Sequence, residues 1–168
     1  TLNIDNPKLN CRLEGFSQFS PKRIILDRNL EINLRSYIAK LGSEMCIRDS
    51  HNSNDKSKIK LLKKRGAILI KQSTDKYKNL DLKKILKDLY KMEIRNLLVE
   101  GGDILTKNFI QKKLFNEFYM FRSSKNLSKN KKHVNFTSFS ILNTKYNKHK
   151  INSKLATDKL TIYKNWNV

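Results

Sequence analysis

The residues best suited to chemistry stand where Glu100 is followed by Gly101 and Gly102. The apolar run before them, residues 97–99, is typical of a strand covered on both faces of a parallel sheet. Glycines permit a sharp turn close to a ligand, and a following helix directs unpaired N–H groups at an anion. The pattern predicts a phosphate site beside Glu100. A plain corner with an exposed acid explains it equally well, because two adjacent glycines are far less specific than a dinucleotide fingerprint.

A second candidate group lies earlier in the chain. Asp5 could accept hydrogen bonds from a ligand, and Arg12 could hold a phosphate through two parallel hydrogen bonds, although each alone is more often an ordinary surface charge. Residues 23–27 form another buried-strand pattern, which ends in Asp27 and is followed by Arg28. Two strands that each end in an acid suggest one ligand-facing edge of a sheet.

Hydrophobic periodicity gives the elements that position these residues. Helices are expected at 57–64, closed by Arg65-Gly66, at 81–92 with Asp81 near the amino end, and from 104 to about 114. Strands are expected at 23–27, 67–71, 97–99, 117–122 and 160–163. Helices that alternate with strands predict an α/β fold with a mostly parallel sheet, and the last strand is expected at an antiparallel C-terminal edge.

Other segments carry weaker signals. Pro7 forces Asn6 out of helical geometry, so 1–12 is expected to be a structured loop with a short extended piece. Residues 29–40 fit a turn and a short strand or helix, and 136–147 are weakly patterned. The charged segment 123–132 is expected to be a flexible loop.

The charge is strongly basic, with 36 Lys and Arg against 15 Asp and Glu and a net charge of +21. Such a charge raises the question of nucleic acid or anionic membranes. Most of these cations are lysines spread along the chain among many asparagines, and no Arg-rich block or aromatic-basic platform is present, so nucleic acid is not the expected partner. An attraction for phosphorylated substrates is compatible both with a surface that binds anions and with an ordinary solvated surface.

The cysteines and histidines argue against metal binding and disulfides. Cys11 and Cys46 form neither a disulfide framework nor a zinc spacing, and the three histidines lack metal-ligand spacing. With no signal peptide and no apolar run of membrane-spanning length, the expected location is the cytoplasm.

Two features suggest an altered or partial sequence. Residues 41–50 contain no lysine or asparagine, unlike their neighbours, and look like a translated sequencing-adapter artefact. This segment is expected to be a non-native insert that replaced a real strand. The chain also begins at Thr1, inside what looks like a motif, so residues 1–168 are expected to be one domain that is incomplete at its N-terminus.

Four separated motifs agree with one family. They are Thr-x-x-x-Asp-Asn-Pro-x-Leu-x-x-Arg at 1–12, Pro-x-Arg-Ile-Ile-Leu-Asp at 21–27, Leu-Leu-Val-Glu-Gly-Gly-x-x-Leu at 97–105 and Leu-Phe-Asn-Glu-Phe at 114–118. In this order they resemble the reductase domain of the bifunctional riboflavin-biosynthesis deaminase–reductase. The resemblance implies a dihydrofolate-reductase-like fold and an oxidoreductase. The implied reaction is the NADPH-dependent reduction of 5-amino-6-(5-phosphoribosylamino)uracil to the ribitylamino product.

The resemblance also implies site residues and partners. Substrate contacts fall on Leu9, Arg12 and Glu100. Cofactor contacts fall on Thr1, Asp5, Arg28, Gly102, Asp103, Ile104, Leu105, Thr106, Lys107 and Asn108. It implies an N-terminal zinc deaminase domain in the full-length protein and a homodimer. It names no catalytic proton donor, since solvent could supply the proton, and the truncated chain itself could be inactive.

Three alternatives stay open from the sequence. A related NADPH reductase of the same fold could act on another pterin-like or sugar-linked substrate, because fold alone does not fix the substrate. The net charge allows a basic nucleic-acid-binding module, whose affinity would fall steeply with salt. The third alternative is a purely structural remnant.

Overall fold

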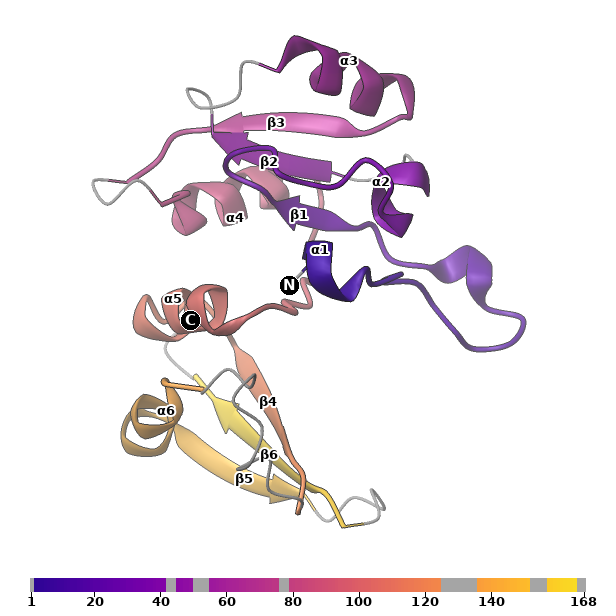
Figure 1. Cartoon of the computed structure of the whole chain (residues 1–168). Coiled ribbons are helices and arrows are strands. Elements are labelled where there is room, and N and C mark those ends of the chain that lie inside the picture. Colours follow the sequence, from indigo (N-terminus) through magenta and orange to yellow (C-terminus); the bar gives the residue numbers. More distant parts are fainter. Residues whose placement is uncertain are drawn as a thin grey trace. The chain divides into compact units, whose positions relative to one another are not determined.

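The computed structural model describes residues 2–41, 45–49, 55–75, 79–124, 136–151 and 157–165 (Figure 1). The chain divides into two compact units, Thr1–Arg95 and Asn96–Val168. The described strands of the first unit form a parallel sheet, and those of the second form an antiparallel sheet. Whether the chain acts as the single domain expected from its sequence stays a prediction.

The parallel sheet of the first unit has the order β1-β2-β3 among the described residues. Ile25 pairs with Cys46, which pairs in turn with Leu69. In Figure 1, helices α3 and α4 lie on opposite sides of this sheet. The strands are β1 (Ile24–Leu26), β2 (Met45–Asp49) and β3 (Ile68–Gln72), and the helices are α1 (Leu2–Asp5), the 3-10 helix η1 (Ser17–Phe19), α2 (Tyr37–Leu41), α3 (Lys56–Lys64) and α4 (Leu82–Lys91).

Local signals explain where the two longer helices of this unit begin and end. Asp55 caps α3 by accepting a hydrogen bond from the Lys58 amide at 2.8 Å, and Gly66 ends it with a φ of 89°. Asp81 caps α4 through the amides of Lys83 and Lys84. The helices predicted from the sequence at 57–64 and 81–92 are therefore confirmed.

A buried apolar cluster holds the first unit together. The Arg65 guanidinium, half-buried beside this cluster, donates to the carbonyl oxygens of Leu34 and Ala39, at 2.8 and 3.1 Å. These bonds fasten the end of α3 to the α2 segment. The buried members of the cluster are Ile25, Leu30, Ile32, Ile38, Ala39, Leu62 and Ala67.

The second unit packs helices against an antiparallel sheet whose described strands have the order β4-β6-β5. Ile110, Leu142 and Tyr163 form its buried centre, so α5, α6 and β6 meet there. The side-chain amide of Asn165 donates to two carbonyl oxygens in the segment that leads from α5 to β4. The elements are α5 (Asp103–Gln111), β4 (Glu117–Arg122), α6 (Phe139–Lys145), β5 (Asn147–Ile151) and β6 (Lys159–Lys164).

The strand expected at 97–99 does not form. These residues belong to neither described sheet, and Leu97, Leu98 and Val99 are 40%, 81% and 38% exposed. An apolar run gives a segment a reason to be buried, but a strand also needs a neighbouring strand whose backbone groups it can pair. None pairs with this segment in the described part of the chain.

Other expectations had mixed outcomes. Residues 2–5 form a helical turn instead of an extended piece, while Asn6 leaves the helix with a φ of 42°, as Pro7 requires. The suspected insert contributes β2, so a parallel strand does occupy this part of the chain. The weakly patterned 136–147 region contains α6 and the start of β5.

The remaining strands and the loop complete this comparison. The strands expected at 23–27, 67–71 and 117–122 are present as β1, β3 and β4. The last strand, β6, is antiparallel as expected, but its expected edge position is wrong, because β6 pairs on both sides and lies between β4 and β5. Most of the loop expected at 123–132 lies outside the described residues. Within the described ranges, no helix has the length and apolar character needed to cross a membrane.

Candidate functional site

The predicted site residues divide between the two units. Asp5, Leu9, Arg12 and Arg28 lie in the first unit, whereas Glu100 and residues 102–108 lie in the second. Thr1 lies outside the described residues. That these two groups form one site stays a prediction.

Asp27, the acid that ends β1, has a structural role. Its two carboxylate oxygens accept hydrogen bonds from the backbone amides of Glu31 and Ile32, both at 2.7 Å. The carboxylate therefore shapes the turn that follows β1, and the ligand-facing edge suggested by the two acids stays a prediction. The next residue, Arg28, is half-buried, and its Nε donates to the side chain of Asn29 at 3.2 Å.

The other three candidates of the first unit differ in how open they are. Asp5 and Arg12 are exposed, so each can meet a ligand without further rearrangement. Leu9 has a φ of 46° and packs, half-buried, against the apolar cluster. Its side chain therefore contributes to the core whether or not its backbone contacts a substrate.

The diglycine junction forms the N-terminus of α5. Gly102 is the N-cap residue, with φ −74° and ψ 174°, and no side chain caps the helix. This backbone is open to any residue, so Gly102 is not needed there for its conformational freedom. A Cβ on Gly101 would lie 2.9 Å from Cδ2, at the flexible end of the Leu105 side chain, which could move aside, so packing does not strictly require that glycine. The uncapped first turn leaves backbone donors for an anionic group.

The side chains around this turn are partly engaged. Asp103 accepts hydrogen bonds from the Thr137 amide at 3.1 Å and from the Thr137 hydroxyl at 2.9 Å. Asn108 donates its side-chain amide to the Ile104 carbonyl at 2.9 Å. Asp103 thereby ties the start of α5 to the segment before α6.

Three of the predicted contact side chains around this turn remain accessible. Glu100 and Lys107 are exposed, and Ile104 is 79% exposed. Leu105 and Thr106 are half-buried. The accessible positions thus carry one acid, one cation and one apolar side chain, a mixture suited to a polar ligand with some apolar surface.

A polar contact fastens the end of β3. The side-chain amide of buried Gln72 donates to the Asp88 carboxylate on α4 at 2.5 Å, and Lys91 lies 3.7 Å from the same carboxylate. The hydrogen bond from Gln72 lowers the pKa of Asp88, with smaller contributions from Lys91 and Lys84, while burial opposes the shift. This contact joins strand to helix and involves none of the predicted site residues.

No group of three or more His, Cys, Asp and Glu side chains that could hold a metal ion occurs among the described residues.

Sequence reasoning missed the pairing of Asp103 with Thr137, because 34 residues separate them. It also missed the turn-forming role of Asp27. The local signal for that role was available, because Asp27 is followed by Arg28 and Asn29, and Asp and Asn favour turns.

Comparison with known proteins identifies the family. The family model described as the RibD C-terminal domain matches residues 1–153. The chain belongs to the RibD C-terminal domain family. The RibD protein of Aquifex aeolicus (strain VF5) is 32% identical over 125 residues, which cover 74% of this chain and 33% of that protein. The chain therefore spans about a third of the length of this curated RibD relative.

Solved RibD structures agree in fold. Acinetobacter baumannii RibD aligns with 98% of this chain and 44% of that one, with a TM-score of 0.69 and 20% identity. A pyrimidine reductase-like protein from Corynebacterium diphtheriae aligns with 98% of this chain and 72% of that one, with a TM-score of 0.67 and 14% identity. The fold is the α/β fold of the dihydrofolate-reductase-like RibD reductase domains.

Proposed function

We propose that this chain is the reductase part of a bifunctional riboflavin-biosynthesis enzyme. Its reaction is the reduction of 5-amino-6-(5-phosphoribosylamino)uracil to the ribitylamino product, with NADPH as the hydride source. The observation that carries the proposal is the family match over residues 1–153, which includes the diglycine junction. In the full-length protein we expect a zinc deaminase domain before this chain, and a homodimer.

The N-terminus of α5 fits a phosphate-bearing cofactor. No side chain caps its first turn, and the Asp103 carboxylate is held by Thr137. The amides of this turn and the positive end of the helix dipole can therefore bind an anionic group. In this proposal Glu100, Arg12 and the backbone near Leu9 bind the substrate, while Asp5 and residues 102–108 bind the cofactor.

The cofactor supplies the hydride, and the protein binds and orients the reactants. Arg12 is an exposed guanidinium, which can hold the substrate phosphate through two parallel hydrogen bonds. Arg28 would favour the 2′-phosphate of NADPH over the free hydroxyl of NADH. We assign no proton donor, since solvent can supply the proton.

The test is a fluorescence titration of the chain with NADPH and with NADH, with circular dichroism as the measure of folding. We expect saturable binding that prefers NADPH. Arg28→Ala should reduce that preference and leave NADH affinity unchanged. An unchanged preference would rule out the role of Arg28, and a folded chain that binds neither nucleotide would contradict the proposal for this chain.

A second variant tests the helix terminus itself. Gly102→Asp is compatible with the backbone at φ −74° and ψ 174°, and an aspartate at the N-cap stabilises a helix. Its carboxylate would occupy the amides of the first turn and repel a phosphate. We expect NADPH affinity to fall by about ten-fold, comparable to the loss of one charge-assisted hydrogen bond. Gly102→Ala, which adds no charge, should bind much more tightly than Gly102→Asp.

A further inference from the structure

A basic hollow lies on one face of the antiparallel sheet in the second unit. Its volume is about 450 Å³, which falls in the range of small-molecule sites, roughly 300–1,000 Å³. Arg122 comes from β4, Lys159 from β6, and Lys148 and Lys150 from β5. None of the predicted cofactor or substrate residues lines it.

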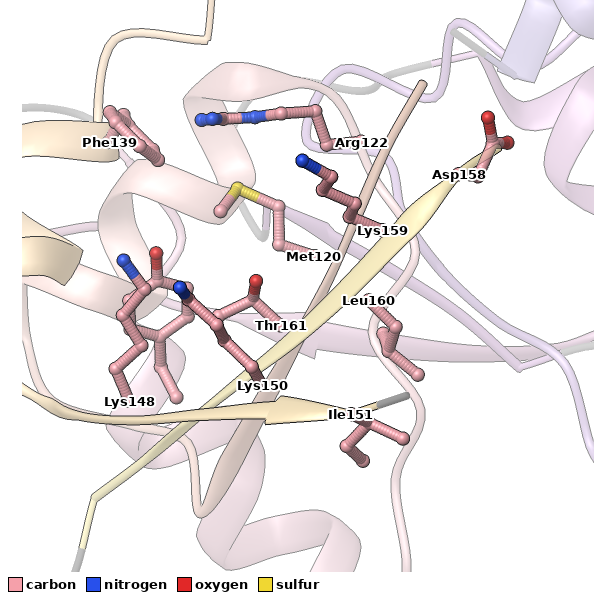
Figure 2. A pocket seen from close by; sticks show the side chains of 11 residues that line it. Met120, Arg122, Phe139, Lys148, Lys150, Ile151, Asp158, Lys159, Leu160 and Thr161 are labelled. Atoms are coloured by element: carbon pink, nitrogen blue, oxygen red, sulfur yellow. The ribbon is translucent and has the colours of Figure 1, made fainter. Parts of the chain in front are cut away.

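The strand register directs these cations to one face. Arg122 pairs directly with Lys159, and Lys150 pairs directly with Thr161. Lys148 is two residues before Lys150, and side chains two apart on a strand share a face. Figure 2 shows the ends of these four basic side chains extending to the same side of the strands.

The positive charges of the hollow have little compensation. Like charges directly opposite each other on neighbouring strands are destabilising, as for Arg122 and Lys159. Asp158 is the one carboxylate of the lining, and Figure 2 shows it at the far end from Lys148. Within the described ranges, no ion pair to a carboxylate is found for Arg122, Lys148, Lys150 or Lys159.

The part of the unit that follows the start of α5 offers little further counter-charge. After Asp103, the sequence contains only two acidic side chains, Glu117 and Asp158. Glu117 is one residue before Phe118 of the apolar centre, so it lies on the opposite face of β4. It is also engaged there, because Tyr119 donates to it at 2.5 Å and Lys164 lies 3.3 Å away.

Buried side chains line the base of the hollow, and one of its cations is held in place by an aromatic ring. Tyr163 is fully buried and Met120 half-buried beneath it. The Arg122 guanidinium lies 4.6 Å from the centre of the Phe139 ring, a cation–π contact that restricts the arginine. A restricted guanidinium loses less entropy when it binds a phosphate, and Thr161 adds a hydroxyl donor.

We infer that this hollow binds a small ligand with a diphosphate or triphosphate group. Several phosphate oxygens can meet cations from three strands at once and relieve the repulsion between Arg122 and Lys159. The size of the hollow favours a small molecule over a nucleic-acid strand. The residues that line this hollow include none of the cofactor contacts proposed at Asp5, Arg28 and residues 102–108.

The test uses inorganic tripolyphosphate and the whole chain, by isothermal titration calorimetry at low ionic strength, where surface charges are least screened. Lys150→Gln with Lys159→Gln removes two cations of the hollow. We expect binding to weaken by about ten-fold or more, since charge-assisted hydrogen bonds are lost. Lys150→Arg with Lys159→Arg keeps both charges and should retain binding, which separates a lost site from a lost fold.

A charge-matched control removes two lysines elsewhere. Lys83→Gln with Lys87→Gln changes the net charge equally on the exposed surface of α4 and should leave the affinity unchanged. An equal loss in both glutamine pairs, or none in either, would overturn the inference in favour of a diffuse attraction. Tight binding of a single-stranded oligonucleotide without binding of tripolyphosphate would overturn it in favour of nucleic acid.

A final measurement separates this inference from the proposed function. Tripolyphosphate binding does not depend on the reductase assignment, so it is informative even for a chain that binds no NADPH. In a chain that binds NADPH, the Lys150→Gln, Lys159→Gln pair should keep the wild-type NADPH affinity. A parallel loss of NADPH affinity would overturn the claim that the hollow is a separate site.

Discussion

The two units of this chain differ in how many acidic side chains accompany their cations. In the first unit, Asp27, Asp55, Asp81 and Asp88 each accept hydrogen bonds that shape a turn, begin a helix or join a strand to a helix. In the second unit acids are scarce, and four cations converge on one sheet face with Asp158 as the only carboxylate in the lining. The comparison teaches that net charge alone does not locate an anion site. A group of cations without neighbouring carboxylates is the better guide to such a site.

The largest expected effects test the buried centre of each unit. Leu142 is fully buried in the second unit, and Ile38 is 1% exposed in the first. Either residue changed to alanine should destabilise the protein by about 2–5 kcal/mol, because buried contacts are lost and a cavity remains. Hydrogen exchange should show lower amide protection in β4 and β6 for Leu142→Ala, and in β1 and β3 for Ile38→Ala. Unchanged protection in those strands would contradict the assigned cores.

A smaller effect tests the structural use of carboxylates in the first unit. Asp27→Ala leaves the amides of Glu31 and Ile32 without their acceptors and should cost about 1–3 kcal/mol in urea unfolding. Asp27→Asn keeps one acceptor oxygen and should cost less. The control is Asp5→Ala, an exposed position, where a change within about 0.5 kcal/mol is expected. A similar cost at Asp5 and Asp27 would remove the distinction.

The smallest expected effect is a pH dependence from Asp88. Its folded pKa is lowered, first by the hydrogen bond from Gln72. A group with a lowered folded pKa stabilises the protein above its unfolded value, about 3.9, and this contribution is lost as the pH falls through the folded pKa. NMR titration of the Asp88 carboxyl should therefore give a midpoint below that of a free aspartate. Gln72→Leu should raise the midpoint, and an unchanged midpoint would show that the hydrogen bond is not its cause.

Local signals predicted much of the secondary structure. Asp81 begins α4 and Gly66 follows α3 because capping and left-handed backbone are properties of a few adjacent residues. The strands at 24–26 and 117–122 follow from their short hydrophobic patterns. The start of α5 after the diglycine junction was likewise predicted, although the ordinary backbone of Gly102 shows that conformational freedom is not its reason.

The sequence by itself determined the capped helices and most of the strands, because these depend on residues close together in the chain. It also determined the family to which the chain belongs, because the family motifs follow one another in a fixed order. Only the tertiary structure decided which apolar runs are paired, so that 97–99 does not form a strand although β2 does. It also decided which charges meet. Arg122, Lys150 and Lys159 come from three different strands, and they share one hollow because the strand register places them on the same face.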